Sequence, residues 1–233
     1  MNMPQAMIPE TIWSESRPRT VFLARHGQSE SNAEERISGQ ADTALTEKGR
    51  RQAQRLATAL QGIPLTRILT SSLKRSMETA GPTAELQGIA ACPTDSLREM
   101  SFGILEGRLR NHLDQESQSL LDRWTQDKLH FRIPSGENLL DVRNRVVPLL
   151  SKVFAENPNG TLLIVGHRHT NLVILSVLMG WDLTSTADSS IRSKYLYEID
   201  CTATPLIHTT CLTGAGRGSR VEGFLDEENS CAH

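Results

Sequence analysis

Two histidines in this sequence each follow a short apolar run that has the pattern of a buried strand. His26 lies in an RHG tripeptide directly after residues 21–24, and His167 comes directly after residues 161–166. Because ligands of open α/β sheets bind outside the carboxyl ends of the strands, these two side chains could meet across one crevice. A pair of imidazoles there could support nucleophilic or acid–base chemistry, although either histidine taken alone is more often a structural residue.

The elements that position these histidines alternate between strand and helix patterns. The apolar runs predict strands over residues 21–24, 68–70, 161–165 and 195–200, with a weaker one over 206–210. Apolar stripes and stop signals predict helices from about Thr46 to Gly62, around residues 75–77, from about Ser135 to Val153, and over 169–179 with Gly180 as the stop. This alternation predicts an α/β fold, a three-layer αβα sandwich with a mostly parallel central sheet.

Composition limits the classes of partner. The 233 residues fit one domain, and a net charge of −2 provides no global basic field for nucleic acid or an anionic membrane. The first 20 residues contain no signal-peptide pattern, and no run approaches the roughly 18–20 apolar residues of a membrane span, so we expect a cytoplasmic protein. The four cysteines form no CxxC pair, which argues against a zinc site.

Five ordered motifs carry a resemblance to a known family. They are RHGQSESNAEERISGQADTALTEKGRRQA from residue 25, SSLKRSMETA from residue 71, LREMSFGILEG from residue 97, PSGENLLDVRNRV from residue 134 and LLIVGHRHTN from residue 162. Their order resembles the histidine phosphatase superfamily, also called the phosphoglycerate mutase-like family. The resemblance covers most of the chain from about residue 20 to 200, and it implies a phosphoglycerate mutase-like fold.

The resemblance implies a role for five residues. His26 would attack phosphorus and form a phosphohistidine, with its other ring nitrogen donating to the carbonyl of Gly27 or a group close to it. Glu99 would protonate the leaving oxygen, which requires that burial or bound phosphate raise its pKa. The phosphate would be bound by three further residues, Arg25, Arg75 and His167. Glu106 is the rival acid, with a structural role as its alternative.

Other positions match the edge of the phosphate pocket. Asn32, Ser38 and Gly39 fall at family positions that line it, although each could instead belong to a turn. Many family members have glycine after the second histidine, whereas this sequence has Arg168 and then His169. One hypothesis is that Arg168 or His169 contacts a second anionic group on the substrate. The alternatives are a solvent-facing or ion-paired arginine and a His169 that caps the next helix.

The sequence therefore predicts a phosphomonoester hydrolase that acts on a small phosphorylated metabolite without a metal or organic cofactor. FGILEG resembles the phosphatase branch, and the alternatives are mutase-type phosphoryl transfer or an inactive binding protein on the same fold. The predicted domain spans residues 19–212, between a flexible N-terminal arm (1–18) and a flexible C-terminal tail (213–233). Segment 100–135 is expected to cover the pocket. The substrate and the oligomeric state stay open, with a homodimer among the alternatives.

Overall fold

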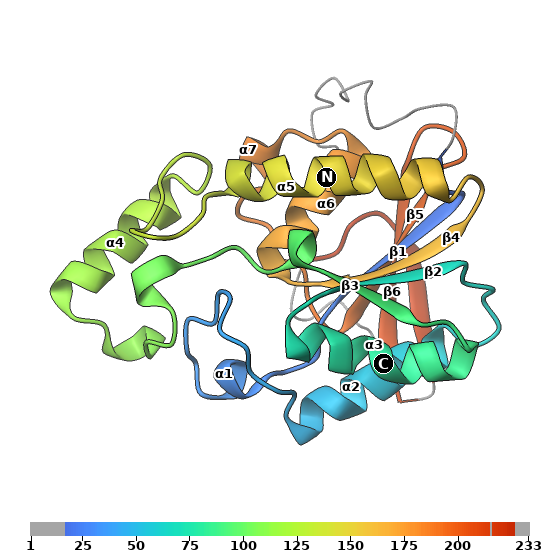
Figure 1. Ribbon diagram of the computed structural model, residues 1–233, viewed down its shortest axis with the longest axis horizontal. Helices are drawn as coiled ribbons and strands as arrows, with labels where there is room; N and C mark the ends of the chain where they lie inside the picture. Colours follow the sequence, from blue (N-terminus) through green and yellow to red (C-terminus); the bar gives the residue numbers. More distant parts are fainter. Residues whose placement is uncertain (1–16, 215, 227–233) are drawn as a thin grey trace.

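A seven-stranded sheet forms the centre of the computed structural model, which describes residues 17–214 and 216–226. Its strands are β1 (Thr20–Arg25), β2 (Arg67–Ser71), β3 (Ala91–Thr94), β4 (Thr161–Gly166), β5 (Tyr195–Asp200), β6 (Leu206–Thr213) and β7 (Gly216–Glu222). The order is β3-β2-β4-β1-β5-β6-β7 (Figure 1). The first four strands of this order are parallel, and β5, β6 and β7 continue the sheet in antiparallel pairs.

Helices cover both faces of the sheet (Figure 1). One face carries α2 (Glu47–Ala59) and α3 (Lys74–Gln87), and the other carries α5 (Leu139–Glu156) and α6 (Arg168–Met179). Alternate residues of β1 pack into different clusters, with Phe22 on the α2 side and Leu23 on the α6 side. Strands buried on both faces need apolar residues at every position, and this confirms the predicted αβα sandwich.

The register of the two central strands places the two histidines together. β1 and β4 pair in parallel with Arg25 opposite Gly166. His26 and His167 are the next residues of the two segments, so they lie side by side. The N–H of His26 extends this ladder by donating to the carbonyl of Gly166 at 3.0 Å.

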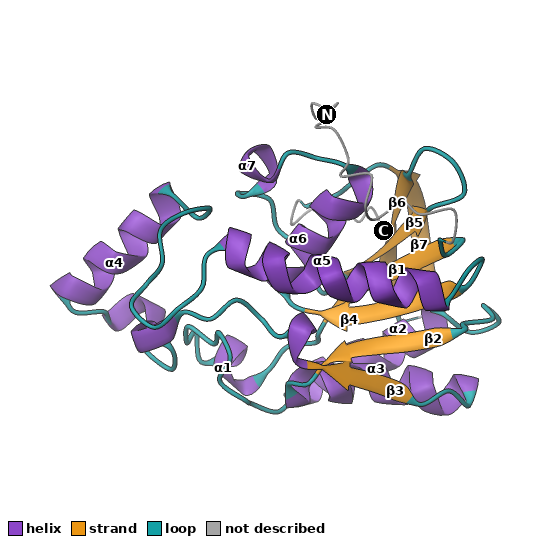
Figure 2. Ribbon diagram, turned by 45° about the horizontal axis from the view of Figure 1, so that its top comes forward, coloured by secondary structure: helices purple, strands orange, loops and turns teal. Residues whose placement is uncertain are grey.

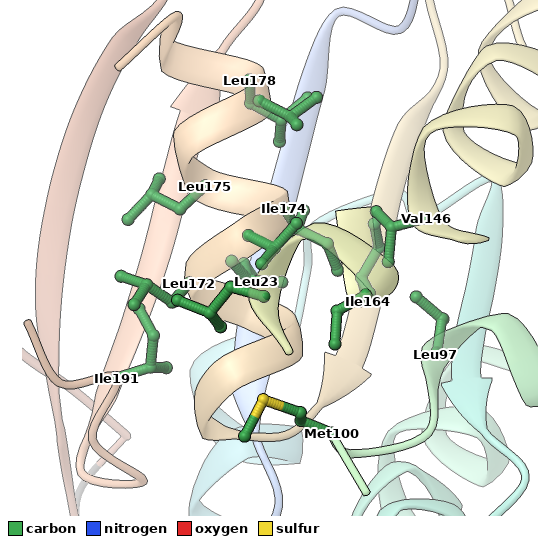
Figure 3. Close-up of a cluster of buried hydrophobic side chains, with 14 of the residues drawn as sticks. Leu23, Leu97, Met100, Val146, Ile164, Leu172, Ile174, Leu175, Leu178 and Ile191 are labelled. Carbon is green, nitrogen blue, oxygen red and sulfur yellow. The ribbon is translucent and has the colours of Figure 1, made fainter. Parts of the chain in front are cut away.

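The apolar core beneath α6 also fixes the loop that carries Glu99. Leu23 and Ile164 from the strands meet Leu172 and Ile174 from α6, and fully buried Met100 packs in the same cluster (Figure 3). Because Met100 follows Glu99 in the chain, burying its side chain restrains where that carboxylate lies.

Local capping sets the helix boundaries. Thr46 is the N-cap of α2, and Gly180 ends α6 with a left-handed φ of 64°, as the sequence predicts. α5 begins at Leu139, later than the predicted start near Ser135, because Asn138 forms a capping box with Asp141.

Shorter elements lie beyond the carboxyl ends of the parallel strands. Among them are α1 (Glu30–Ala33) and α4 (Gln115–Gln126), and α4 projects from the sheet on the side toward which the arrowheads point (Figure 2). The remaining short helices are η1 (Asp95–Leu97), η2 (Gly103–Leu105), η3 (Arg110–His112) and α7 (Leu183–Thr186). None of the described helices has the length and apolar character that a bilayer crossing requires.

The C-terminal part of the chain corrects one predicted boundary. β6 runs to Thr213 and β7 follows it, so the prediction of a flexible tail from residue 213 is wrong for this segment. The chain beyond β7 also contacts the domain, since the hydroxyl of Tyr197 donates to the carbonyl of Leu225 at 3.0 Å. Residues 1–16 of the predicted arm and 227–233 of the predicted tail lie outside the described residues.

Candidate active site

His26 is held as a neutral imidazole with one nitrogen free to react. Its Nδ1 lies 2.7 Å from the carbonyl oxygen of Gly27, so Nδ1 carries the proton and Nε2 keeps its lone pair. The side chain is 4% exposed. Burial, followed by the positive charges of Arg75 and Arg25, holds the pKa of His26 well below its ordinary value of 6.5. The predicted contact between His26 and Gly27 is therefore confirmed.

The backbone turn after His26 depends on glycine at two positions. A Cβ on Gly27 would lie 2.5 Å from the carbonyl oxygen of Gly49, and a Cβ on Gly49 would lie 2.1 Å from the carbonyl oxygen of Gln28. The N–H of Gly27 donates to the hydroxyl of Thr79 at 3.0 Å. Only glycine, which has no Cβ, permits this approach between the loop and α2, and the approach fixes the direction of His26.

His167 faces His26 at the end of β4. Their ring centroids are 4.9 Å apart, with 58° between the ring planes. Nδ1 of His167 accepts from Nε of Arg75 at 3.3 Å, and Nε2 lies 3.3 Å from the hydroxyl of Ser76. Burial, followed by the interaction with His26 and the charge of Arg75, holds the pKa of His167 well below 6.5. Both imidazoles are thus neutral before an anion binds.

Arg75 extends from the first turn of α3 into the same place. Its NH1 donates to the carbonyl of Ala41 at 2.6 Å, and its NH2 donates to the carbonyl of Gly39 at 2.7 Å. These contacts orient a guanidinium that is 1% exposed, and burial lowers its pKa from 12.5. A buried, pre-oriented cation is suited to bind a phosphoryl oxygen.

Arg25 is the last residue of β1, and its NH1 donates to the carbonyl of Ile191 at 3.1 Å. Burial is the main cause that lowers its pKa to about 10. Its buried Nε has no hydrogen-bond partner in the described part of the chain. Since such a donor is costly to leave unpaired, an anion at this site would satisfy it.

Glu99 is anchored at the N-terminus of α6. One oxygen, Oε1, accepts from the backbone N–H groups of Met100, His169 and Thr170 at 2.9, 3.2 and 3.3 Å. Burial alone raises the pKa of Glu99, but its interactions with His169 and His167 and the Met100 N–H bring it well below 4.5. Of the two causes that the sequence analysis considered, burial does not by itself give Glu99 a raised pKa in the anion-free site, and the effect of bound phosphate stays a prediction.

His169 lies against the second carboxylate oxygen of Glu99. Its Nδ1 is 3.4 Å from Oε2, and its ring packs edge-on against Phe102 and Trp124, with centroids 5.6 and 5.4 Å away. Burial lowers its pKa, although Glu99 opposes this. His169 lies within the first turn of α6, and the N-cap of this helix is His167. The alternative prediction that His169 caps the helix is therefore wrong. Trp124 of α4, in the predicted covering segment, thereby contacts the histidine that lies against Glu99.

Glu106 has the contacts of a structural carboxylate. Its Oε1 accepts from the N–H groups of Gln40 and Phe102 and from the hydroxyl of Ser101, at 2.9–3.0 Å. A Cβ on Gly39 would lie 2.2 Å from this same oxygen, and φ there is +46°. These contacts support the structural alternative for Glu106, and they show that Gly39 is required where its carbonyl orients Arg75.

The remaining candidates have differing surroundings. Asn32 lines a cavity with His26, but its Oδ1 also closes the capping box of α1 by accepting from the N–H of Ser29 at 3.3 Å. Ser38 is half-buried, and its hydroxyl makes a long 3.5 Å contact to the carbonyl of Arg36. Arg168 is half-buried in the first turn of α6, and its Nε has no hydrogen-bond partner among the described residues.

Three supporting residues escaped the sequence analysis. Ser76 and Thr79 lie on the face of α3 beside Arg75, and Thr79 connects the Gly27 N–H to the carbonyl of Arg75. Asn171 donates to the carbonyl of Ala24 at 2.9 Å and thereby joins α6 to β1. The i+4 spacing from Arg75 signals Thr79 only weakly, because the same spacing serves ordinary packing, and Ser76 has no such signal.

The arrangement has one chemical use above others. Two arginines and two neutral imidazoles converge where β1 and β4 end, and an ionised carboxylate lies close enough to influence the pKa of all four. Such a site can bind an oxyanion, attack it with a nitrogen and transfer a proton.

Comparison with known proteins agrees with this geometry. The model of the histidine phosphatase superfamily (branch 1) matches residues 21–204. A curated relative, named probable phosphoglycerate mutase GpmB of Cronobacter sakazakii, is 32% identical over 185 residues, which cover 79% of this chain and 86% of that protein.

Two solved structures are similar to most of this chain. The α-ribazole phosphatase of Shigella flexneri superposes with a TM-score of 0.76 at 26% identity, covering 84% of this chain and 98% of that one. A mycobacterial glucosyl-3-phosphoglycerate phosphatase in complex with VO3 gives a TM-score of 0.71 at 26% identity, covering 78% and 92%. The relatives thus include proteins named as phosphatases and proteins named as mutases.

Proposed function

This chain belongs to the histidine phosphatase superfamily, and on that premise we propose that it is a phosphomonoester hydrolase that forms a phosphohistidine on His26. The 2.7 Å contact from Nδ1 of His26 to the carbonyl of Gly27 carries the proposal, because it leaves Nε2 unprotonated and free to attack. The proposed substrate is a small phosphorylated metabolite.

In the first step, Nε2 of His26 forms a bond to phosphorus as the ester P–O bond breaks. Arg25, Arg75 and His167 hold the phosphoryl oxygens, where negative charge is spread in the transition state. The departing alkoxide takes a proton from Glu99. A bound phosphate adds negative charge beside Glu99 and His167 and raises both pKa values, so Glu99 can take up a proton on substrate binding.

In the second step, the Glu99 carboxylate removes a proton from a water molecule, and the resulting hydroxide attacks phosphorus. The P–N bond breaks, inorganic phosphate leaves and His26 returns to its neutral form. The positive charge comes from arginine and histidine side chains, so the proposed mechanism requires neither a metal ion nor an organic cofactor.

The solved structures named as phosphatases favour hydrolysis, and they agree with the resemblance of FGILEG to the phosphatase branch. The relative named as a mutase favours a second candidate, in which phosphohistidine returns its phosphoryl group to a sugar acid. Incubation with 3-phosphoglycerate separates the two functions, because a hydrolase releases phosphate whereas a mutase forms 2-phosphoglycerate. A cytoplasmic location and the absence of nucleic-acid or membrane partners remain parts of the proposal.

The test is hydrolysis of 4-nitrophenyl phosphate in excess EDTA by wild type, His26→Ala and His112→Ala. His112 is an exposed histidine and serves as the matched control. We expect wild type and His112→Ala to be active with EDTA and His26→Ala to be inactive. Activity that EDTA abolishes, or that His26→Ala retains, contradicts the proposed mechanism.

A further inference from the structure

A cavity of about 470 Å³ opens beside His26, and both of its walls carry positive charge. One wall is a face of α2 with Lys48, Gln52 and Arg55, which are spaced so that they lie along one side of the helix. The other wall is the segment from Arg192 to Lys194, which precedes β5. None of the described residues that line this cavity is acidic.

The two walls are joined by hydrogen bonds, so the cavity is a built groove. Oε1 of Gln52 accepts from the N–H of Gln28 at 2.8 Å, and Nε2 of Gln52 donates to the hydroxyl of Ser193 at 3.2 Å. Gln52 thereby ties α2 both to the loop after His26 and to the segment that carries Arg192. The spacing of the two backbone segments that carry these cations is therefore set by the fold.

Two cations on the α2 wall, Lys48 and Arg55, are not paired with a carboxylate among the described residues. Arg50 and Arg51 of α2 pair with Glu47, whereas Lys48 and Arg55 make no ion pair with a described residue. The whole chain has a net charge of −2, so the positive charge of this groove is a local feature and not the result of an overall basic composition. A groove with one sign of charge concentrates ligands of the opposite sign.

We propose that this groove binds a second anionic group of the substrate, a carboxylate or a second phosphate, while the scissile phosphate lies at His26. The inference rests on the proposed phosphatase function and defines its substrate class as phosphomonoesters whose alcohol portion is itself anionic. A volume of about 470 Å³ falls within the range of small-molecule sites and can hold a skeleton of several carbons. Arg168, which the sequence analysis considered for this role, does not line the groove.

The test uses three open-chain ligands with the same six-carbon skeleton as competitive inhibitors of 4-nitrophenyl phosphate hydrolysis. Sorbitol 6-phosphate has no second charge, 6-phosphogluconate adds a carboxylate, and sorbitol 1,6-bisphosphate adds a phosphate. We expect at least one charged ligand to bind about tenfold more tightly than the neutral one, as charge-assisted hydrogen bonds imply. The charged ligand that binds more tightly shows whether the groove prefers a carboxylate or a phosphate. Its advantage in affinity over the neutral ligand should shrink as ionic strength rises.

The double variant Lys48→Gln/Arg55→Gln should reduce this preference to about twofold or less, whereas Arg51→Gln on the same helix should retain it. Glutamine forms helices well, and Lys48 and Arg55 are exposed, so the helix is expected to fold. Taking the ratio of inhibition constants within each variant removes any general change in activity.

Three outcomes would overturn the proposed role of the groove while leaving the phosphatase function intact. They are equal inhibition by the three ligands, inhibition by none of them, and an unchanged preference in the double variant. If wild type does not hydrolyse 4-nitrophenyl phosphate, the proposed function is contradicted instead. The same affinity ratios are then measured as Kd values by calorimetry on the wild-type protein, with the same criteria.

Discussion

Oε2 of Glu99 lies 3.4 Å from Nδ1 of His169, and each side chain is 10% exposed. The two residues are 70 positions apart in the chain, and packing of His169 against Phe102 and Trp124 holds the pair in place. Together with the N–H groups of α6, this contact gives the proposed acid a fixed position. The interaction with His169, together with His167 and the Met100 N–H, lowers the pKa of Glu99 and so favours the carboxylate until a phosphate adds negative charge to the site.

Glu99→Gln should slow turnover of an alkyl phosphate by about 10²–10⁴-fold, because the alkoxide then leaves without a proton donor. With 4-nitrophenyl phosphate, whose leaving group departs without a proton, the first turnover should be nearly normal and the next ones slow. Rapid mixing would show this as a burst of nitrophenol. Glu106→Gln is the control, since Glu106 binds backbone and hydroxyl donors in the loop. If Glu106→Gln shows this leaving-group dependence and Glu99→Gln does not, the two roles are reversed.

Arg75→Lys should reduce kcat/KM by about 10²–10³-fold, because removing one hydrogen-bond donor that stabilises a transition state typically costs this much. Lysine keeps the charge but cannot contact Gly39, Ala41 and His167 at once, as the guanidinium does. Inhibition by inorganic phosphate should weaken in parallel. Arg67→Lys changes a surface ion pair with Glu156 at 2.8 Å and is the matched control. Similar kinetics for the two variants would show that the fork of Arg75 is not needed.

Stability should fall as the pH drops below 6.5. The pKa values of buried His26 and His167 lie well below 6.5 in the folded protein, so the unfolded chain binds protons more readily. Their contribution to stability is therefore complete above pH 6.5 and is lost as the pH falls toward the folded pKa values. Each group can contribute a slope of up to about 1.4 kcal/mol per pH unit.

Urea unfolding at pH 7.5 and 5.5 measures this slope. We expect His167→Gln to show a smaller loss of stability between the two pH values than wild type, and exposed His112→Gln to show the wild-type loss. An unchanged slope in His167→Gln would mean that His167 does not take part.

Gly27→Ala should destabilise the fold by about 1–3 kcal/mol, because its Cβ would meet the carbonyl oxygen of Gly49 at 2.5 Å. Gly81→Ala is the matched control, since a Cβ there meets no heavy atom within 4 Å of the described structure. Because Gly81 precedes Pro82 in α3, the gain from alanine in a helix is offset by crowding with the proline ring, and we expect a change of less than about 1 kcal/mol. Thermal unfolding compares the two variants, and an unaltered melting temperature for Gly27→Ala would contradict the close approach.

Local sequence patterns predicted much of the fold and the placement of the two histidines. Continuous apolar runs in β1 and β4 end at His26 and His167, and parallel pairing then brings these residues together. β7 was not predictable in this way. Its sequence, Gly216–Glu222, is mostly exposed and polar, so it lacks the alternation that marks a strand with one buried face.

The ionisation of Glu99 could not be read from its neighbours in the chain. Burial and nearby charge act in opposite directions on its pKa, and the sign depends on donors from α6 about 70 residues away. The family motif identified which carboxylate to consider. Only the folded arrangement shows which protonation state that carboxylate has before an anion binds.

Trapping the phosphorylated enzyme tests the central claim most directly. Wild-type protein is mixed with a ³²P-labelled phosphomonoester, quenched in alkali within the first turnover, digested and mapped by mass spectrometry. We expect an acid-labile, alkali-stable phosphoryl group on the peptide that contains His26, and none in His26→Ala. Label on another residue, or product formed with no labelled protein at any time within the first turnover, would contradict the phosphohistidine mechanism.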